Sequence, residues 1–197
     1  MTHDLLAALV LFVFVATVTP GPNNLMVMAS GANFGFRRTV PHMLGIGIGF
    51  SLMVLLVGVG LAQVFNAFPP LYQVLKAASI AYLLYLAWKI AHAAPVKQGA
   101  AEGRPMTFLQ AAAFQWVNPK AWTMAITATT AYAPSQTLAA MGLIALTFGL
   151  VCFPVVSTWT LAGQQLARLL TSPSRLTIFN WTMATLLVAS LIPVILP

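Results

Sequence analysis

Lys120 is the residue of this sequence with the clearest chemical potential, because it lies in an apolar stretch directly after Asn118 and Pro119. Its charge would sit about 18 Å along the helix, too deep to reach lipid headgroups easily, and burial there costs at least ~2.5 kcal/mol. The only acids, Asp4 and Glu102, fall at chain ends or loops. Lys120 must therefore pair with freed carbonyls, water or a bound anion. We expect it to contact a substrate carboxylate or hold the chain open here, unless it merely neutralises the half-helix before Pro119.

Prolines interrupt two apolar stretches where an unbroken membrane helix would be expected. They are Pro20 and Pro22, in Thr19-Pro20-Gly21-Pro22-Asn23-Asn24, and Pro119. Each lacks the N–H that would bond the carbonyl four residues earlier, so the carbonyls released are those of Ala16, Val18 and Gln115. Open backbone groups at membrane depth are tolerated only beside protein or a water-filled cavity. The two breaks therefore predict a solute pathway near the middle of the membrane.

Each break also has the pattern of a helix start. Thr19-Pro20 and Asn118-Pro119 match an N-cap residue followed by proline at the first helical position. The free N–H groups and the positive end of the helix dipole would suit a carboxylate. The unpaired carbonyls of the preceding half-helices would suit an ammonium group. Because an α-amino acid carries both groups, the breaks predict a site for that class of solute.

The predicted substrate-binding residues all lie at the two breaks. They are Pro20, Gly21, Pro22, Asn23, Asn118, Pro119 and Lys120. Asn24 and Gln115 lie beside them, but amides within a span join helices as often as they bind ligands. We expect no catalytic residue, metal or cofactor, because two acids and the single Cys152 offer no carboxylate pair and no metal cluster.

The composition places the chain in a lipid bilayer. Of its 197 residues, 60% are hydrophobic and 6% are charged, whereas about a quarter are charged in a typical water-facing protein. Nine Lys and Arg give a net charge of +7 without a basic stripe, so we expect no nucleic-acid partner. Apolar runs long enough to cross a core of ~30 Å predict spans at roughly 5–30, 40–65, 71–92, 107–131, 136–161 and 176–196.

These spans predict one membrane domain, residues 1–197, of a definite architecture. It comprises a first half (1–92), a polar cytoplasmic loop (93–106) and a second half (107–197). Three spans per half invert the second half relative to the first. The predicted fold class is therefore an all-α polytopic membrane protein with two inverted three-helix repeats. Paired breaks in corresponding helices of such repeats point to a substrate site at the midplane.

The distribution of cations predicts how the chain sits in the membrane. Seven of them fall on one side of the predicted spans: Arg37, Arg38, Lys89, Lys97, Arg104, Arg168 and Arg175. Loops rich in Lys and Arg stay in the cytoplasm. We therefore expect that side to be cytoplasmic and both termini to lie outside.

Three other features leave two interpretations open. Gly45-x-x-x-Gly49 allows close helix packing, within one chain as the commoner use or between the chains of a homodimer. Pro154 is either a hinge or a bend that neighbouring helices absorb. His42 could sense cytosolic pH, although an interfacial position is the simpler interpretation.

Over nearly its whole length, the sequence resembles the LysE/RhtB family of bacterial amino-acid exporters. The resembling segments are Thr19-Pro20-Gly21-Pro22-Asn23-Asn24, Gly35-Phe36-Arg37-Arg38, Ala81-Tyr82-Leu83, Ala87-Trp88-Lys89 and Asn118-Pro119-Lys120-Ala121. The resemblance implies a transporter of the bacterial inner membrane. It would export amino acids or close derivatives and would use the proton gradient or the membrane potential rather than ATP.

One departure from the family bears on substrate and coupling. Many members carry Asp where this chain has Asn23, and an intramembrane carboxylate is the usual proton carrier. Lys120, His42 and the substrate's own amine remain as titratable groups. The Asn23-Asn24 pair resembles members that handle small neutral substrates such as cysteine or O-acetylserine, and homoserine and threonine belong to the same class. The alternative is a passive channel or facilitator for small polar solutes, which would also need broken helices around a polar path.

Overall fold

The structure, a computed structural model, describes all residues except 62, 64–66, 94–103, 136, 171 and 196–197. Its described part is helical and contains no strand. The helices are α1 (His3–Val18), α2 (Pro22–Phe34), α3 (Phe36–Leu56), η1 (Val57–Leu61), α5 (Pro69–Ala91), α6 (Phe108–Phe114), η2 (Gln115–Val117), α7 (Pro119–Ala131), α8 (Leu138–Ala167), α9 (Pro173–Ala189) and α10 (Ile192–Ile195). Most of the predicted loop 93–106 lies outside the described residues.

The all-helical membrane character of the prediction is confirmed. Three helical segments of the described chain are long and apolar enough to cross a membrane: Phe36–Leu61, Gln73–Ala91 and Leu138–Ala167. The pair α1 and α2 qualifies as a fourth, broken span that bends by 54°. The predicted spans 107–131 and 176–196 are helical but do not qualify on length, so the six-span inverted repeat remains a prediction.

Two helix boundaries differ from the predicted ones. The predicted span 40–65 begins at Phe36 and passes into a π-helical segment that contains Gly60, whose φ of 120° interrupts the regular helix. The predicted span 136–161 continues to Ala167, and Pro154 lies inside the uninterrupted helix α8. The neighbouring helices therefore accommodate this proline within a continuous α8.

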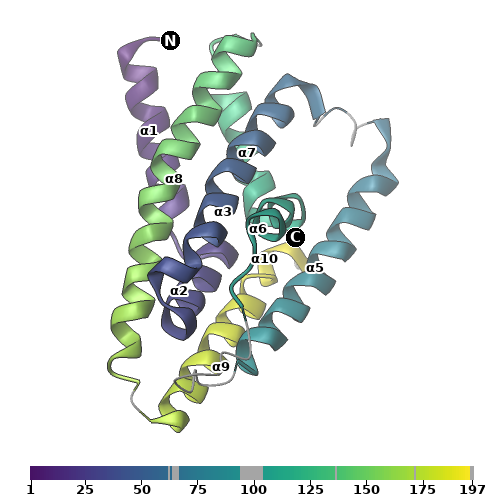
Figure 1. Ribbon diagram of the computed structural model, residues 1–197. Coiled ribbons are helices and arrows are strands. Elements are labelled where there is room, and N and C mark those ends of the chain that lie inside the picture. Colours follow the sequence, from purple (N-terminus) through teal and green to yellow (C-terminus); the bar gives the residue numbers. More distant parts are fainter. Residues whose placement is uncertain (62, 64–66, 94–103, 136, 171, 196–197) are drawn as a thin grey trace.

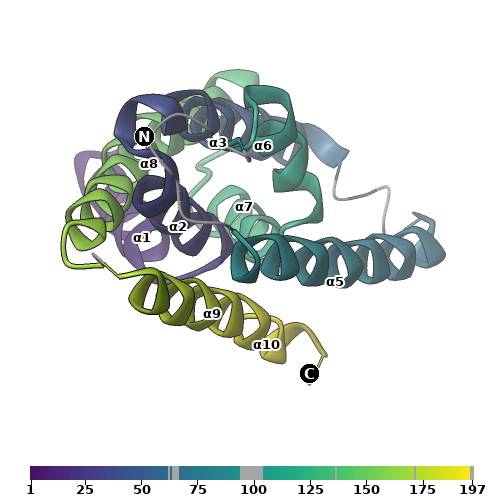
Figure 2. The same ribbon diagram turned by 60° about the horizontal axis from the view of Figure 1, so that its bottom comes forward.

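Helix α8 is the centre of one packing group. It makes its most extensive contacts with α2 and α3 and also packs against α1 (Figure 1). Helices α5 and α9 pair with each other, and α6 packs on α3. With the bottom of the molecule turned forward, α5 and α9 lie side by side along one side, with α7 above them (Figure 2). This arrangement brings both predicted breaks, α1–α2 and α6–α7, to one region of the bundle.

Glycines let the helix backbones around the breaks approach closely. A Cβ added to Gly31 of α2 would collide with the backbone of Thr160, and one added to Gly163 of α8 would collide with the backbone of Met28. Added Cβ atoms on Gly45 and Gly49 of α3 would likewise meet α6. The prediction that the Gly45-x-x-x-Gly49 pattern packs helices within the chain is confirmed.

This packing predicts opposite effects for two substitutions in α8. Gly163→Ala should lower the free energy of unfolding by about 1–3 kcal/mol, because the obstructing atoms belong to rigid backbone. Gly142→Ala should be neutral or stabilising by up to ~1 kcal/mol, because no atom lies within 4 Å of the added methyl group. Thermal unfolding of the purified variants in detergent measures both effects. Equal midpoints would contradict the described α2–α8 contact.

Candidate functional site

The two helix breaks meet, and Lys120 joins them. Lys120 is the second residue of α7, after the second break, yet its Nζ donates to the carbonyl of Thr19 at 2.8 Å and to the Thr19 hydroxyl at 2.8 Å. The carbonyl of Pro20 lies 3.4 Å from the same nitrogen. All three acceptor atoms belong to residues of the first break. The ammonium group is therefore held by backbone oxygens from the other half of the chain.

A pair of amides forms the second link between the breaks. The Nδ2 of Asn23 donates to Oε1 of Gln115 at 2.9 Å, and the Nε2 of Gln115 donates to Oδ1 of Asn23 at 3.1 Å. The same Nε2 donates to the carbonyl of Ala111 at 2.9 Å. Gln115 is fully buried. The reciprocal pair thus fixes α2 against the end of α6.

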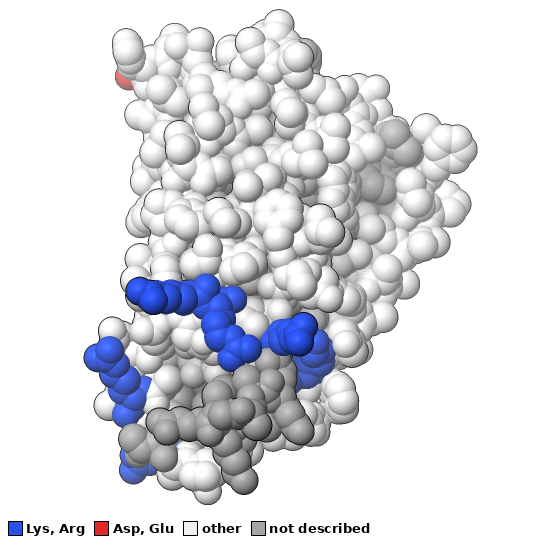
Figure 3. Space-filling view, viewed as in Figure 1, with Lys and Arg blue, Asp and Glu red and all other residues white. Residues whose placement is uncertain are grey.

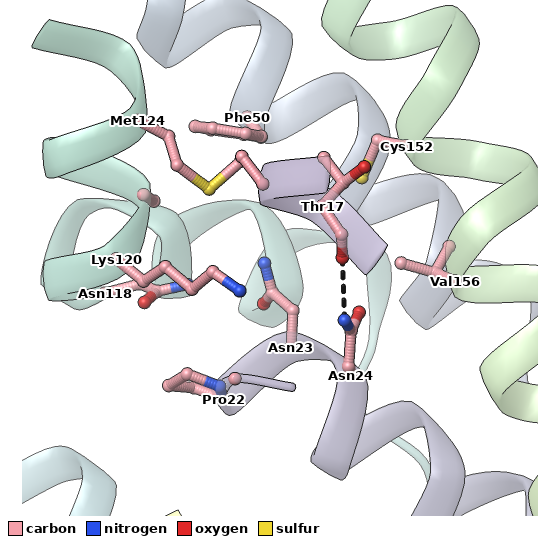
Figure 4. A pocket seen from close by; sticks show the side chains of 13 residues that line it. Thr17, Pro22, Asn23, Asn24, Phe50, Asn118, Lys120, Met124, Cys152 and Val156 are labelled. Atoms are coloured by element: carbon pink, nitrogen blue, oxygen red, sulfur yellow. Dashed lines mark hydrogen bonds between the residues drawn. The ribbon is translucent and has the colours of Figure 1, made fainter. Parts of the chain in front are cut away.

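The side chain of Asn24 bonds backbone carbonyls on the other side of the first break. Its Nδ2 donates to the carbonyl of Thr17 at 2.7 Å and to that of Thr19 at 2.9 Å. The bond to Thr17 is the dashed line in Figure 4, which also shows Lys120 extending toward Asn23. Asn24 is buried, and its amide supplies donors to two carbonyls that the end of α1 leaves without a helical N–H.

Around these groups lies a small cavity of about 30 Å³, which has room for one or two waters. Its walls come from α1, α2, α3, α7 and α8, together with Asn118. The lining residues are Ala16, Thr17, Gly21, Pro22, Asn23, Asn24, Phe50, Asn118, Lys120, Ala121, Met124, Cys152 and Val156. Asn118 is buried and its Oδ1 has no hydrogen-bond partner. This oxygen is an open acceptor at the edge of the site.

A larger cavity of about 520 Å³ adjoins the central one. The two share Ala16, Gly21, Pro22, Lys120 and Met124. Pro20 and Pro119 also line the larger cavity. The structure thus brings all seven predicted site residues together around Lys120, although whether they bind a substrate remains a prediction.

The predicted helix start at the first break is wrong by two residues. Thr19 is the C-cap of α1, and its hydroxyl bonds backward to the carbonyl of Ala16 at 3.0 Å. Gly21 is the N-cap of α2, and Pro22 occupies the first turn. Helix α2 begins at the second of the two prolines. The first proline cannot begin it, because the N–H of Thr19 still bonds the carbonyl of Val15 and completes the last turn of α1. At the second break the prediction is confirmed, since Asn118 is the N-cap and Pro119 follows.

The predicted supply of open carbonyls is also wrong in part. The Ala16 carbonyl accepts the Thr19 hydroxyl, and the Gln115 carbonyl accepts the N–H of Asn118 at 3.2 Å. These two oxygens are therefore occupied by the chain itself. The pairing of Lys120 with backbone carbonyls is confirmed, but its acceptors belong to the first break. The interpretation in which it neutralises only the half-helix before Pro119 does not describe this contact.

Several residues at the site carry no clear binding signal in the sequence. Asn24 and Gln115 join helices, which is the commoner use of amides within a span. The apolar walls Phe50, Met124 and Val156 carry no local signal, because only packing brings three different helices to one cavity. Cys152 is buried, as expected. His42 is buried within the fold too.

Comparison with known proteins assigns the family. The sequence pattern of the LysE type translocator family matches residues 14–194. The chain belongs to the LysE family of translocators. The resemblance noted from the sequence is thereby confirmed, and membership indicates transport.

Curated relatives of this translocator carry a more specific name. The cysteine/O-acetylserine efflux protein of Escherichia coli (strain K12) is 33% identical over 178 residues, which cover 86% of this chain and 87% of the relative. The protein of the same name from Shigella sonnei (strain Ss046) shows the same identity and coverage. No solved structure matches the chain.

The different bonding of the two neighbouring asparagines predicts unequal tolerance to aspartate. Asn24→Asp should lower the free energy of unfolding by about 3 kcal/mol, because two donated bonds are lost and a carboxylate faces two carbonyls. Asn23→Asp should cost about 1–2 kcal/mol, because it loses one donated bond, to Oε1 of Gln115, while its other oxygen still accepts from Nε2 of Gln115. Thermal unfolding in detergent compares the two isomeric variants. An equal loss at both positions would contradict the described bonding.

Proposed function

We propose that this translocator exports small neutral amino acids or their close derivatives across the bacterial inner membrane. Cysteine, O-acetylserine, homoserine and threonine are the candidates. Family membership supports amino-acid export, and the name of the Escherichia coli and Shigella relatives favours the first two compounds. The proton gradient or the membrane potential would supply the driving force.

The proposed orientation follows from charge. The Lys and Arg residues visible in Figure 3 gather in the lower part of the molecule, which we call the cationic end. Helix junctions at that end carry Arg37, Arg38, Lys89, Arg104, Arg168 and Arg175. Cytoplasmic loops attract and retain such residues. The cationic end would therefore face the cytoplasm, where the exported solute binds first.

The contact between Lys120 and Thr19 carries the proposal. An amino-acid carboxylate would compete with the Thr19 carbonyl for the ammonium of Lys120, because a charged acceptor forms the stronger hydrogen bond. The Thr19 and Pro20 carbonyls released by this exchange could then accept from the substrate's ammonium group. The substrate would thus replace a bond that holds the two breaks together. Binding would be coupled to the relative position of α1–α2 and α6–α7.

The chemistry of the lining favours an uncharged substrate side chain. None of the described residues around the central cavity or its larger neighbour is acidic. A lysine-like substrate would bring a second cation beside Lys120 without a fixed counter-charge. At position 23, where many family members carry Asp, this chain has an amide, and that amide is already paired with Gln115. The remaining titratable groups for proton coupling at this site are Lys120 and the substrate amine.

Removal of the Lys120 charge should impair transport without unfolding the protein. Lys120→Met should weaken substrate affinity about ten- to a hundredfold, the loss expected for one hydrogen bond to a charged group. Uptake of labelled O-acetylserine and cysteine into inverted or mixed-orientation proteoliposomes measures the effect. Lys76→Met is the matched control, because Lys76 lies in α5 and lines neither cavity. Unchanged transport by Lys120→Met would refute the assigned role.

The small volume of the central cavity favours an alternating transporter over an open channel. A space of about 30 Å³ cannot pass an amino acid without movement of its walls. We expect proteoliposomes with an imposed proton gradient or membrane potential to accumulate the substrate, and an uncoupler to abolish accumulation. Downhill flux that persists without accumulation would instead indicate the passive channel. Failure of every amino acid to move under either polarity would refute export altogether.

A further inference from the structure

A second cavity, separate from the central one, lies at the cationic end. It has a volume of about 350 Å³ and is bounded by α2, α3, α5 and the segment just before α6. It shares no lining residue with the central cavity. Helix α2 links the two spaces, since Asn23 lines the first and Met26, about one helical turn later, lines the second.

His42 is the unusual group in this cavity. Its side chain is only 2% exposed, and neither ring nitrogen has a hydrogen-bond partner. A buried polar group without a partner is costly, and native structures rarely keep one. The imidazole is therefore placed, at a cost in stability, where only the content of the cavity can satisfy it.

The other buried polar groups of the cavity are already engaged. The hydroxyl of Ser30 bonds that of Thr39 at 2.9 Å, and the Thr39 hydroxyl donates to the Gly35 carbonyl at 2.9 Å. The Nδ2 of Asn33 donates to Asn180 at 2.9 Å. These bonds order the wall of the cavity. They leave His42 as the open hydrogen-bonding group at its buried end.

The exposed end of the cavity is positively charged. Lys89 of α5 and Arg104, before α6, both line it and are exposed. None of the described lining residues is acidic, and Glu102 lies outside the described residues. Met26 and Leu86, both buried, supply apolar wall. An occupant that satisfies all three regions has an anionic group, a short apolar body and an uncharged hydrogen-bonding group.

We propose that this cavity is a second binding site, which takes a small organic carboxylate: Lys89 and Arg104 hold the carboxylate, and His42 bonds the far polar group. Guanidinium and ammonium groups both bind carboxylates through charge-assisted hydrogen bonds. With the cationic end toward the cytoplasm, the site would load the solute before it reaches Lys120. This last step rests on the proposed function, whereas binding to the cavity does not.

Equilibrium binding to the full chain in detergent tests the site apart from transport. O-acetyl-L-serine is the probe, since its ester carbonyl can accept from His42 while its carboxylate meets the cations. The Lys120→Met background removes the main charge of the central site. Titration calorimetry should still detect one binding site for the probe in the Lys120→Met variant. The fluorescence of Trp88, which lines the second cavity, should change on binding. Absence of binding in this background overturns the proposal.

Two variants identify the binding groups in the Lys120→Met background. His42→Leu should weaken binding of the probe at least tenfold, and Arg104→Gln should do so as well. His42→Leu removes unpaired buried nitrogens, so its midpoint of unfolding without ligand should stay equal or rise. Arg168→Gln is the matched control, because it removes a cation at the same end that does not line the cavity. Unchanged affinity in both His42→Leu and Arg104→Gln overturns the proposal.

Two further ligands distinguish a site for a small carboxylate from a site for a lipid headgroup. The amide of O-acetyl-L-serine, which lacks the carboxylate, should bind at least tenfold more weakly than the acid. Phosphatidylglycerol should not displace the acid from the cavity. Displacement by this lipid, or equal binding of the amide, overturns the carboxylate assignment. Wild-type protein that transports but shows no cavity binding refutes this site alone, whereas binding without transport refutes only the proposed function.

Discussion

Backbone groups within an apolar bundle need partners, and this requirement governs the centre of the translocator. Prolines interrupt helices at two places, and side chains supply donors to carbonyls left open at the first break. Asn24 serves the first break locally, whereas Lys120 reaches it from the opposite half of the chain. A charge in such surroundings is itself costly. The first break therefore supplies acceptors for the charge of Lys120, and Lys120 supplies a donor to the open carbonyl of the first break.

In the proposed mechanism, this mutual dependence lets the site change state. The bonds from Lys120 to Thr19 and between Asn23 and Gln115 are side-chain links across an otherwise discontinuous backbone. Side-chain links can exchange partners with a bound solute, whereas the continuous helices α3 and α8 around them cannot. Close backbone contact at Gly163 holds that surrounding frame. The variable contacts are thus confined to the place where a solute would bind.

Sequence reasoning located the breaks because proline has an unambiguous effect on a helix. It placed the start of α7 correctly at Pro119, where one proline leaves one solution. At the first break two prolines allow two solutions, and the choice of Pro22 depends on how Thr19 and Asn24 bond within the folded chain. Apolar runs found the long helices, but length alone did not establish the predicted inverted six-span arrangement.

The sequence by itself determined the membrane setting, the two breaks, the deep Lys120 and the family resemblance, because composition and proline chemistry act locally along the chain. Only the tertiary structure decided that Lys120 pairs with Thr19 and that Gln115 pairs with Asn23, since these partners lie far apart in sequence. It also decided that His42 is buried beside a second cavity. Helical periodicity gives the face a residue occupies, whereas packing decides what that face meets.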